Sequence, residues 1–241
     1  MLDHHRLAYR AIEHVPFLGE RRLRRLVRRT RGERATVPVL LAEGQVLSES
    51  WDIAVYADRE GHGSKLLPAS AEADIRRWND LAERTMIAGR ALTVRALLAS
   101  PRALAESLPP QVPLLVRHLL LPLTRYGTRW FARKYALDLN DTSAPLQALR
   151  EALDRLRTAV AGSGYVLGQF SYADIVMATL LQGVVPVSDD YLPIGPATRQ
   201  AFTQAELGAA YADLIAWRDD LYARHRREVP RMKAPVLNRR E

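Results

Sequence analysis

Two neighbouring stretches carry residues that could bind a small charged molecule. Ser48-Glu49-Ser50 stands directly before an apolar helical pattern, and the N-terminus of a helix attracts carboxylates through its free backbone amides and its dipole. Upstream, Pro38 lies within the strand-like run Val37-Pro38-Val39-Leu40, although proline cannot donate to a ladder. A cis peptide bond at the strand entrance would accommodate the proline and expose the backbone of Val37 to a ligand. Either stretch alone is more typical of a simple hairpin or helix cap.

A third stretch, Ser171-Tyr172-Ala173-Asp174, has the spacing of a reciprocal helix cap. The Ser171 side chain can accept from the amide three residues on, and Asp174 can accept from the Ser171 amide in return. Phe170 can pack onto Ile175 as a hydrophobic staple. A buried helix needs its first amides satisfied in this way, because water cannot reach them. We therefore interpret Ser171 and Asp174 as structural residues and not as catalytic ones.

Arginines dominate the segment from Glu20 to Arg34, which contributes six of the eight net positive charges of the chain. Such a block could meet phosphates or an acidic membrane. However, Leu23, Leu26 and Val27 recur within it at helical spacing, which favours the solvated face of a helix. No aromatic residue stands between the arginines, so a stacking platform for single-stranded nucleic acid is not expected.

The composition excludes several classes of protein. The 241 residues include no cysteine, which rules out disulfides, cysteine-ligated zinc and a cysteine nucleophile within them. No apolar run reaches the roughly 18 residues that cross a bilayer, and no apolar segment follows His4-His5-Arg6 as it would in a secretory signal. We expect a cytoplasmic protein, and we predict no metal site.

The pattern of apolar residues changes along the chain and predicts two domains. Before residue 66 it predicts a helix over residues 2–13, a hairpin of strands 37–42 and 45–47 that turns at Glu43-Gly44, and a helix over residues 51–58. After Pro68 only helical patterns follow. The expected fold class is therefore α/β plus all-α, with domains at 1–66 and 67–226 and a basic, mobile tail at 227–241.

The second domain is predicted to be entirely helical. Periodic apolar residues predict helices over 74–100, 112–136, 144–161, 171–185 and 206–226, with a loop-rich segment at 187–203. Pro122 should kink the second of these helices, because proline lacks an amide donor and clashes with the preceding turn. Gly162 and Gly164 should end the third.

The order of these motifs resembles the cytosolic glutathione transferases of the bacterial type. Val37-Pro38-Val39-Leu40, a hairpin, and Glu49-Ser50 before a helix that ends in Ala54-Val55-Tyr56 look like the latter half of their glutathione-binding domain. The stretch 164–168 followed by Ser171 and Asp174 resembles the capping motif of their helical domain, and 211–217 resembles their last core helix. The resemblance implies a partial thioredoxin-like domain followed by an all-helical C-terminal domain.

The resemblance also implies roles for individual residues. Val37, presented by cis-Pro38, would pair its backbone with the cysteinyl part of glutathione. Glu49 would bind the γ-glutamyl ammonium, and Ser50 would bind the γ-glutamyl carboxylate with its hydroxyl and amide. The bound thiolate is the nucleophile, and it would attack a small apolar electrophile held against the helical domain. A homodimer, with residues 74–100 at the interface, is expected for the same reason.

The chain departs from this family at its N-terminus. The family begins with an inner strand and a catalytic Ser, Cys or Tyr, whereas this sequence begins at the helix that follows them. Leu2 and His5 fall where the catalytic group would stand. Protonated His5 could stabilise a thiolate, but a surface histidine without a role is the preferred interpretation. We expect either further residues before Met1 or a reduced N-terminal domain.

Three functions therefore stay open. The first is a glutathione transferase whose electrophile contacts Trp78, Met86, Arg90 and residues 112–135, although the helical spacing of these residues favours ordinary core. The second is a non-catalytic binding or scaffold protein of the same fold. The third, which we consider the weakest, is membrane attachment through basic and apolar residues between Arg117 and Lys134.

Overall fold

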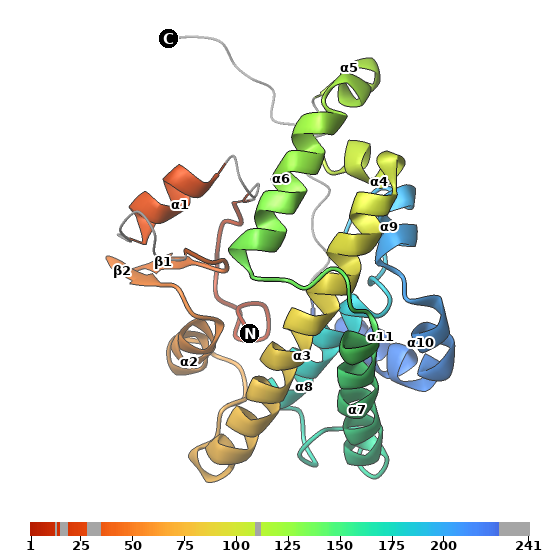
Figure 1. Ribbon diagram of the computed structural model, residues 1–241. Coiled ribbons are helices and arrows are strands. Elements are labelled where there is room, and N and C mark those ends of the chain that lie inside the picture. The colour runs from red at the N-terminus through yellow and green to blue at the C-terminus, as the bar shows by residue number, and fades with distance from the viewer. Residues whose placement is uncertain (13, 15–18, 28–34, 109–111, 227–241) are drawn as a thin grey trace.

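The computed structural model describes residues 1–12, 14, 19–27, 35–108 and 112–226 (Figure 1). This part of the chain is mostly helical and contains one two-stranded antiparallel sheet. The elements in chain order are α1 (Glu20–Leu26), β1 (Leu40–Ala42), β2 (Gln45–Leu47), α2 (Ser50–Glu60), η1 (Ala69–Ala71), α3 (Glu72–Ala99), α4 (Pro101–Glu106), α5 (Leu114–Leu119), α6 (Leu121–Lys134), α7 (Ser143–Val160), α8 (Tyr172–Leu180), η2 (Leu181–Gly183), α9 (Pro196–Phe202), α10 (Ala205–Ala210) and α11 (Ala212–His225).

The long helix α3 lies at the centre of the fold (Figure 1) and packs most extensively against α7 and α8. The apolar face of α7 supplies Leu149, Leu153 and Leu156, whose side chains are completely buried. The nearly all-apolar α8 adds Met177 and Leu180 to the same core. Burying a side chain of this size contributes about 1.5–3 kcal/mol, so the three helices form the most strongly stabilised part of the fold.

The hairpin predicted from Glu43-Gly44 is confirmed. Leu40 pairs with Leu47 and Ala42 with Gln45 across β1 and β2. Glu43 and Gly44 connect the strands with φ angles of 49° and 77°, which is the left-handed conformation of the two-residue turns that suit hairpins. Strand β1 begins at Leu40, three residues later than predicted, because proline at position 38 cannot join the ladder.

The hairpin and α2 lie on one side of α3, and α2 reaches the helical core (Figure 1). Ala54 is buried in the core cluster, and the ring of Trp51 contacts that of Tyr172 edge to face at 5.7 Å. The amide of Tyr172 donates to the carbonyl of Leu66 at 3.0 Å. The two predicted domains are thus joined by both apolar packing and hydrogen bonding, while the boundary at residue 66 stays a prediction.

The helix predicted over residues 2–13 is wrong. Residues 2–6 form turns, and Leu7 to Ile12 have no regular structure. Arg6 has a φ of 54°, a left-handed conformation that a helix interior does not tolerate. The carbonyl of His5 accepts a hydrogen bond from the amide of His62, so a distant loop takes the acceptor that a helix would have used. Residue 13 lies outside the described residues.

The arginine-rich block is described only in part. Its first residues form α1, in which Leu23 is buried and the arginines lie along the more accessible side. This agrees with the solvated-face interpretation for Glu20–Leu26. Residues 28–34 and the basic tail 227–241 lie outside the described residues.

Two predicted long helices are each divided in two. The segment 112–136 forms α5 and α6, with Pro122 in the first turn of α6, where a missing amide donor costs nothing. Pro122 therefore starts a helix and does not kink one. The segment 206–226 forms α10 and α11, which separate at Tyr211 because its backbone leaves the helical region at φ −121°.

Two further predictions need correction. The helix predicted to run to residue 185 ends at Leu180 and continues only as the short η2. The segment 187–203 contains α9, whose first amides are satisfied by Glu106: the carboxylate accepts from Thr198 N at 2.7 Å and from Ala197 N at 3.2 Å. Burial alone would raise the pKa of Glu106, but the hydrogen bonds from Thr198 and Ala197 outweigh it and lower the pKa.

No helix in the described part of the chain is long and apolar enough to span a bilayer.

Candidate functional site: a hairpin end and a helical cavity

The hairpin register brings the predicted ligand-binding residues to one end of the sheet. Because Leu40 pairs with Leu47, the residues before β1 and those after β2 leave the hairpin at the same end. Val37 stands on one side, and Glu49 and Ser50 on the other. The peptide bond between Val37 and Pro38 is cis, as predicted, and Val37 is 47% exposed. Val37 is thus one of the exposed apolar residues of the described chain.

The N-terminus of α2 completes this end of the hairpin. Glu49 is the residue before the first helical turn, and its exposed carboxylate makes no hydrogen bond or ion pair with any described residue. Ser50 begins the helix, and its side chain interacts with the phenol of Tyr172 in a way that favours the ionised phenol. Burial raises the pKa of Tyr172 to about 12, and the Ser50 contact only partly opposes that rise. The first amides of α2 have no acceptor within the helix and are available to an anion.

His5, predicted to be a surface residue, is completely buried. Its Nε2 lies 3.2 Å from Oδ1 of Asp58, which also accepts from the Leu66 amide at 2.6 Å. Desolvation is the main cause that lowers the pKa of His5, with a smaller contribution from His4, while Asp58 acts in the opposite direction. His5 also touches Gly61 so closely that a Cβ there would lie 2.2 Å from the Cβ of His5. These contacts give His5 a structural role between the N-terminus and the loop after α2.

The capping box at α8 is confirmed. Oδ2 of Asp174 accepts from the Ser171 amide at 2.8 Å and from the Ser171 hydroxyl at 2.9 Å. Its Oδ1 accepts from the Val166 amide at 2.8 Å, a contact that the box pattern does not reveal. The ring of Phe170 stacks on that of His225 with centroids 3.7 Å apart.

Lys134 links α6 to the segment that leads into the hairpin. Its ammonium donates to Glu20 Oε1 at 2.6 Å and to the Ala35 carbonyl at 2.7 Å. The side chains of Lys134 and Glu20 are both largely buried. Sequence reasoning missed this role, because Lys134 stands at the end of a basic helix with Arg129 and Arg133 and resembles an ordinary exposed charge.

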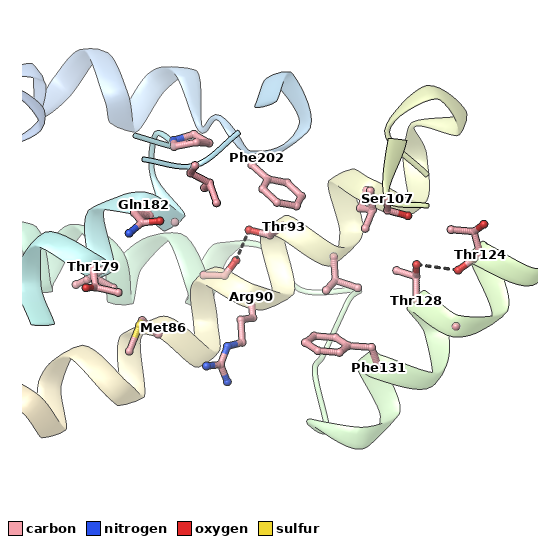
Figure 2. Close-up of a pocket in the computed structure, with 18 of the residues that line it drawn as sticks. Met86, Arg90, Thr93, Ser107, Thr124, Thr128, Phe131, Thr179, Gln182 and Phe202 are labelled. Atoms are coloured by element: carbon pink, nitrogen blue, oxygen red, sulfur yellow. Dashed lines mark hydrogen bonds between the residues drawn. The ribbon is translucent and has the colours of Figure 1, made fainter. Parts of the chain in front are cut away.

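A cavity of about 520 Å³ lies within the helical part of the fold, between α3, α6, α8 and α9 (Figure 2). Met86 and Arg90, both predicted to contact a substrate, line it, whereas Trp78 packs against the core. Figure 2 shows Phe131 and Phe202 entering from opposite sides. The residues that line the cavity are Met86, Gly89, Arg90, Thr93, Val94, Leu97, Ser107, Leu108, Leu123, Thr124, Gly127, Thr128, Phe131, Leu149, Thr179, Leu180, Gln182, Gly183, Pro186, Leu192 and Phe202.

Contacts between side chains lead from this cavity towards the hairpin. The guanidinium of Arg90 lies 5.3 Å from the centre of the Tyr135 ring, and the ammonium of Lys134 lies 5.4 Å from the same ring. Lys134 in turn holds Ala35, two residues before Val37. The Arg90 side of the cavity is therefore the side connected to the hairpin end.

Comparison of the chain with family models, with curated proteins and with solved structures found no match. Within the described residues, no group of three or more His, Asp or Glu side chains is arranged to hold a metal ion.

Proposed function

We propose that this protein is a glutathione transferase-like protein, related to the cytosolic bacterial type, that binds glutathione at the hairpin end and conjugates it to an apolar electrophile. The observation that carries the proposal is the hairpin register, which gathers the exposed residue Val37, the unpartnered carboxylate of Glu49 and the free amides of α2 at one end. In this proposal, residues 1–66 are a partial thioredoxin-like domain and the chain forms a homodimer.

Each of these groups suits one part of glutathione. The backbone of Val37 would pair with the cysteinyl peptide, and the carboxylate of Glu49 would bind the γ-glutamyl ammonium. The γ-glutamyl carboxylate would sit at the N-terminus of α2, where amides and the helix dipole favour an anion. The amide of Ser50 belongs to the first turn of α2 and has no acceptor within the helix, so it is available as a donor together with the Ser50 hydroxyl.

The cavity between α3 and α6 supplies a place for the electrophile. Its volume falls within the range of small-molecule sites, roughly 300–1,000 Å³, and its Arg90 side is connected to the hairpin through Tyr135 and Lys134. With an aryl halide, the glutathione thiolate would form a carbon–sulfur bond and halide would leave, while the thiol proton passes to water.

Turnover is expected to be slow. The thiol pKa of about 8.5 must fall towards neutrality for the thiolate to form readily. His5, the one candidate donor from the sequence, is buried against Asp58 and Gly61. This burial favours the second candidate function, a glutathione-binding protein of the same fold that does not catalyse conjugation.

Calorimetric titration of the chain with glutathione tests the proposed site. Glu49→Gln should weaken binding by roughly 1.5–3 kcal/mol, the size of a lost charge-assisted hydrogen bond. Glu43→Gln is a matched control, since Glu43 is an exposed carboxylate in the turn at the opposite end of the hairpin, and it should leave binding unchanged. The absence of binding at millimolar glutathione would refute the site. Rapid conjugation of an aryl halide would instead reject the non-catalytic function and show that another group activates the thiol.

A further inference from the structure

The hydroxyl groups that line the helical cavity donate to carbonyls of the protein itself. Thr93, Thr124, Thr128 and Thr179 each donate to the carbonyl four residues earlier in their own helix, at 2.8–3.0 Å. Two of these bonds are visible in Figure 2. The Ser107 hydroxyl donates to the Leu104 carbonyl, and the Gln182 amide donates to the Tyr222 hydroxyl.

These internal bonds determine what the cavity offers a ligand. A threonine whose hydroxyl is bonded to its own helix has no donor left for a guest. Apart from Arg90, the remaining lining consists of leucine, valine, methionine, phenylalanine, proline and glycine residues. An occupant therefore gains mainly from burial of apolar surface, and a polar group placed deep in the cavity would lose its hydration without a hydroxyl donor to replace it.

Arg90 is the exception, because it is the one lining side chain with a full charge. It is exposed at the rim, and Figure 2 shows it extending from α3 on the side away from Phe202. No carboxylate belongs to the described lining, and no described residue forms an ion pair with Arg90. The neighbouring cation Lys134 differs, since Glu20 neutralises it at 2.6 Å.

We propose that the cavity binds an apolar molecule bearing one acidic group, with the apolar part among the helices and the acid at the rim beside Arg90. The guanidinium presents a planar array of donors that suits a carboxylate or sulfonate. Binding of such an acid follows from the cavity alone. That acid-bearing apolar compounds are the electrophiles conjugated to glutathione rests on the proposed function.

Two fluorescent probes of the same apolar skeleton test the charge requirement. Anilinonaphthalene sulfonate carries an acid, and its parent N-phenylnaphthylamine is neutral. We expect the chain to bind the sulfonate more tightly. Arg90→Gln should weaken binding of the sulfonate by about fivefold, the effect expected for the loss of a partly solvated ion pair. The affinity for the neutral probe should not change. Arg84→Gln, an exposed arginine of the same helix outside the cavity, should alter neither, and Arg90→Lys should retain most of the preference.

A cavity-filling variant tests the location. A Cβ built on Gly89 would meet nothing within 4 Å, so the Gly89→Leu variant should fold. Its larger side chain should weaken the binding of both probes. Thr93→Phe is a second filling variant, and a retained thermal transition shows that each is folded. Equal affinities for the two probes, equal loss of both in Arg90→Gln, or undiminished binding in the folded filling variants would each overturn the proposal. Neither probe involves glutathione, so a failed glutathione titration would refute the proposed function and leave this result standing.

Discussion

Replacement of Asp174 by alanine should destabilise the protein more than any other change at the α8 cap. The carboxylate is completely buried and accepts from two backbone amides, those of Ser171 and Val166, both at 2.8 Å. Alanine would leave both amides buried without an acceptor, at a cost of about 1–3 kcal/mol each. We therefore expect Asp174→Ala to lower the free energy of unfolding by about 3–4 kcal/mol.

Ser171→Ala should cost less, about 1–2 kcal/mol, the usual size of a lost N-cap. Both backbone contacts of Asp174 survive that change, because they come from amides and not from the Ser171 hydroxyl. The Val166 contact is what separates the two variants. The double variant should lose less than the sum of the two, since both residues act in one hydrogen-bonded unit.

Denaturant unfolding of the wild type, both single variants and the double variant measures these values. Asp174→Asn is the matched control, because it keeps one acceptor oxygen and should have a stability between those of the wild type and Asp174→Ala.

Burial is the main influence on the pKa of Asp174 and raises it, although the Val166 and Ser171 hydrogen bonds act against burial. For a carboxyl group raised in this way, the stabilising contribution is full below the unfolded pKa and declines as the pH rises through the folded pKa. The advantage of the wild type over Asp174→Asn should therefore be larger at pH 4 than at pH 7.

Equal unfolding midpoints for the wild type and Asp174→Ala, with equal denaturant dependence, would refute this reasoning. A loss in Ser171→Ala as large as that in Asp174→Ala would show that the Val166 contact contributes nothing.

Two further substitutions test contacts that join distant segments. Gly195→Ala places a Cβ 2.3 Å from Glu106 Oε2, which must displace the carboxylate from the start of α9, so the unfolding free energy should fall by about 1–2 kcal/mol; an unchanged thermal midpoint would contradict this. Tyr172→Phe removes the buried hydroxyl that interacts with the Ser50 side chain. If that interaction stabilises the fold, the variant should lose about 1 kcal/mol of unfolding free energy, whereas a more stable variant would show that it does not.

The features predicted correctly from the sequence are those determined by neighbouring residues. The turn at Glu43-Gly44 needs left-handed backbone, which glycine supplies, and the box at Ser171 and Asp174 spans three residues. The segment 112–136, which contains Pro122, was correctly predicted to be helical. Its division into α5 and α6 was not predicted, because proline also suits the first turn of a new helix.

The features that were missed depend on residues far apart in the chain. The N-terminal segment matched a helical pattern, but the His5 carbonyl accepts from the amide of His62, and the His5 ring is buried 3.2 Å from Asp58. The apolar spacing of Met86 fits a packed core and a cavity wall equally well, and only the positions of α6 and α9 decide between them. The charge on Lys134 gave no hint of the Ala35 carbonyl that it holds.

Gly89, which lines the cavity, lowers the stability of the helix in which it lies. A glycine in the interior of a helix is less favourable than alanine by roughly 0.5–1 kcal/mol, and a Cβ at this position would meet no neighbouring atom within 4 Å. Selection for stability alone would therefore replace it, and every step towards a larger side chain would reduce the space beside α3. The glycine is a place where thermal robustness and the capacity to admit a ligand oppose each other, so directed evolution for heat resistance should substitute this position at the expense of small-molecule binding.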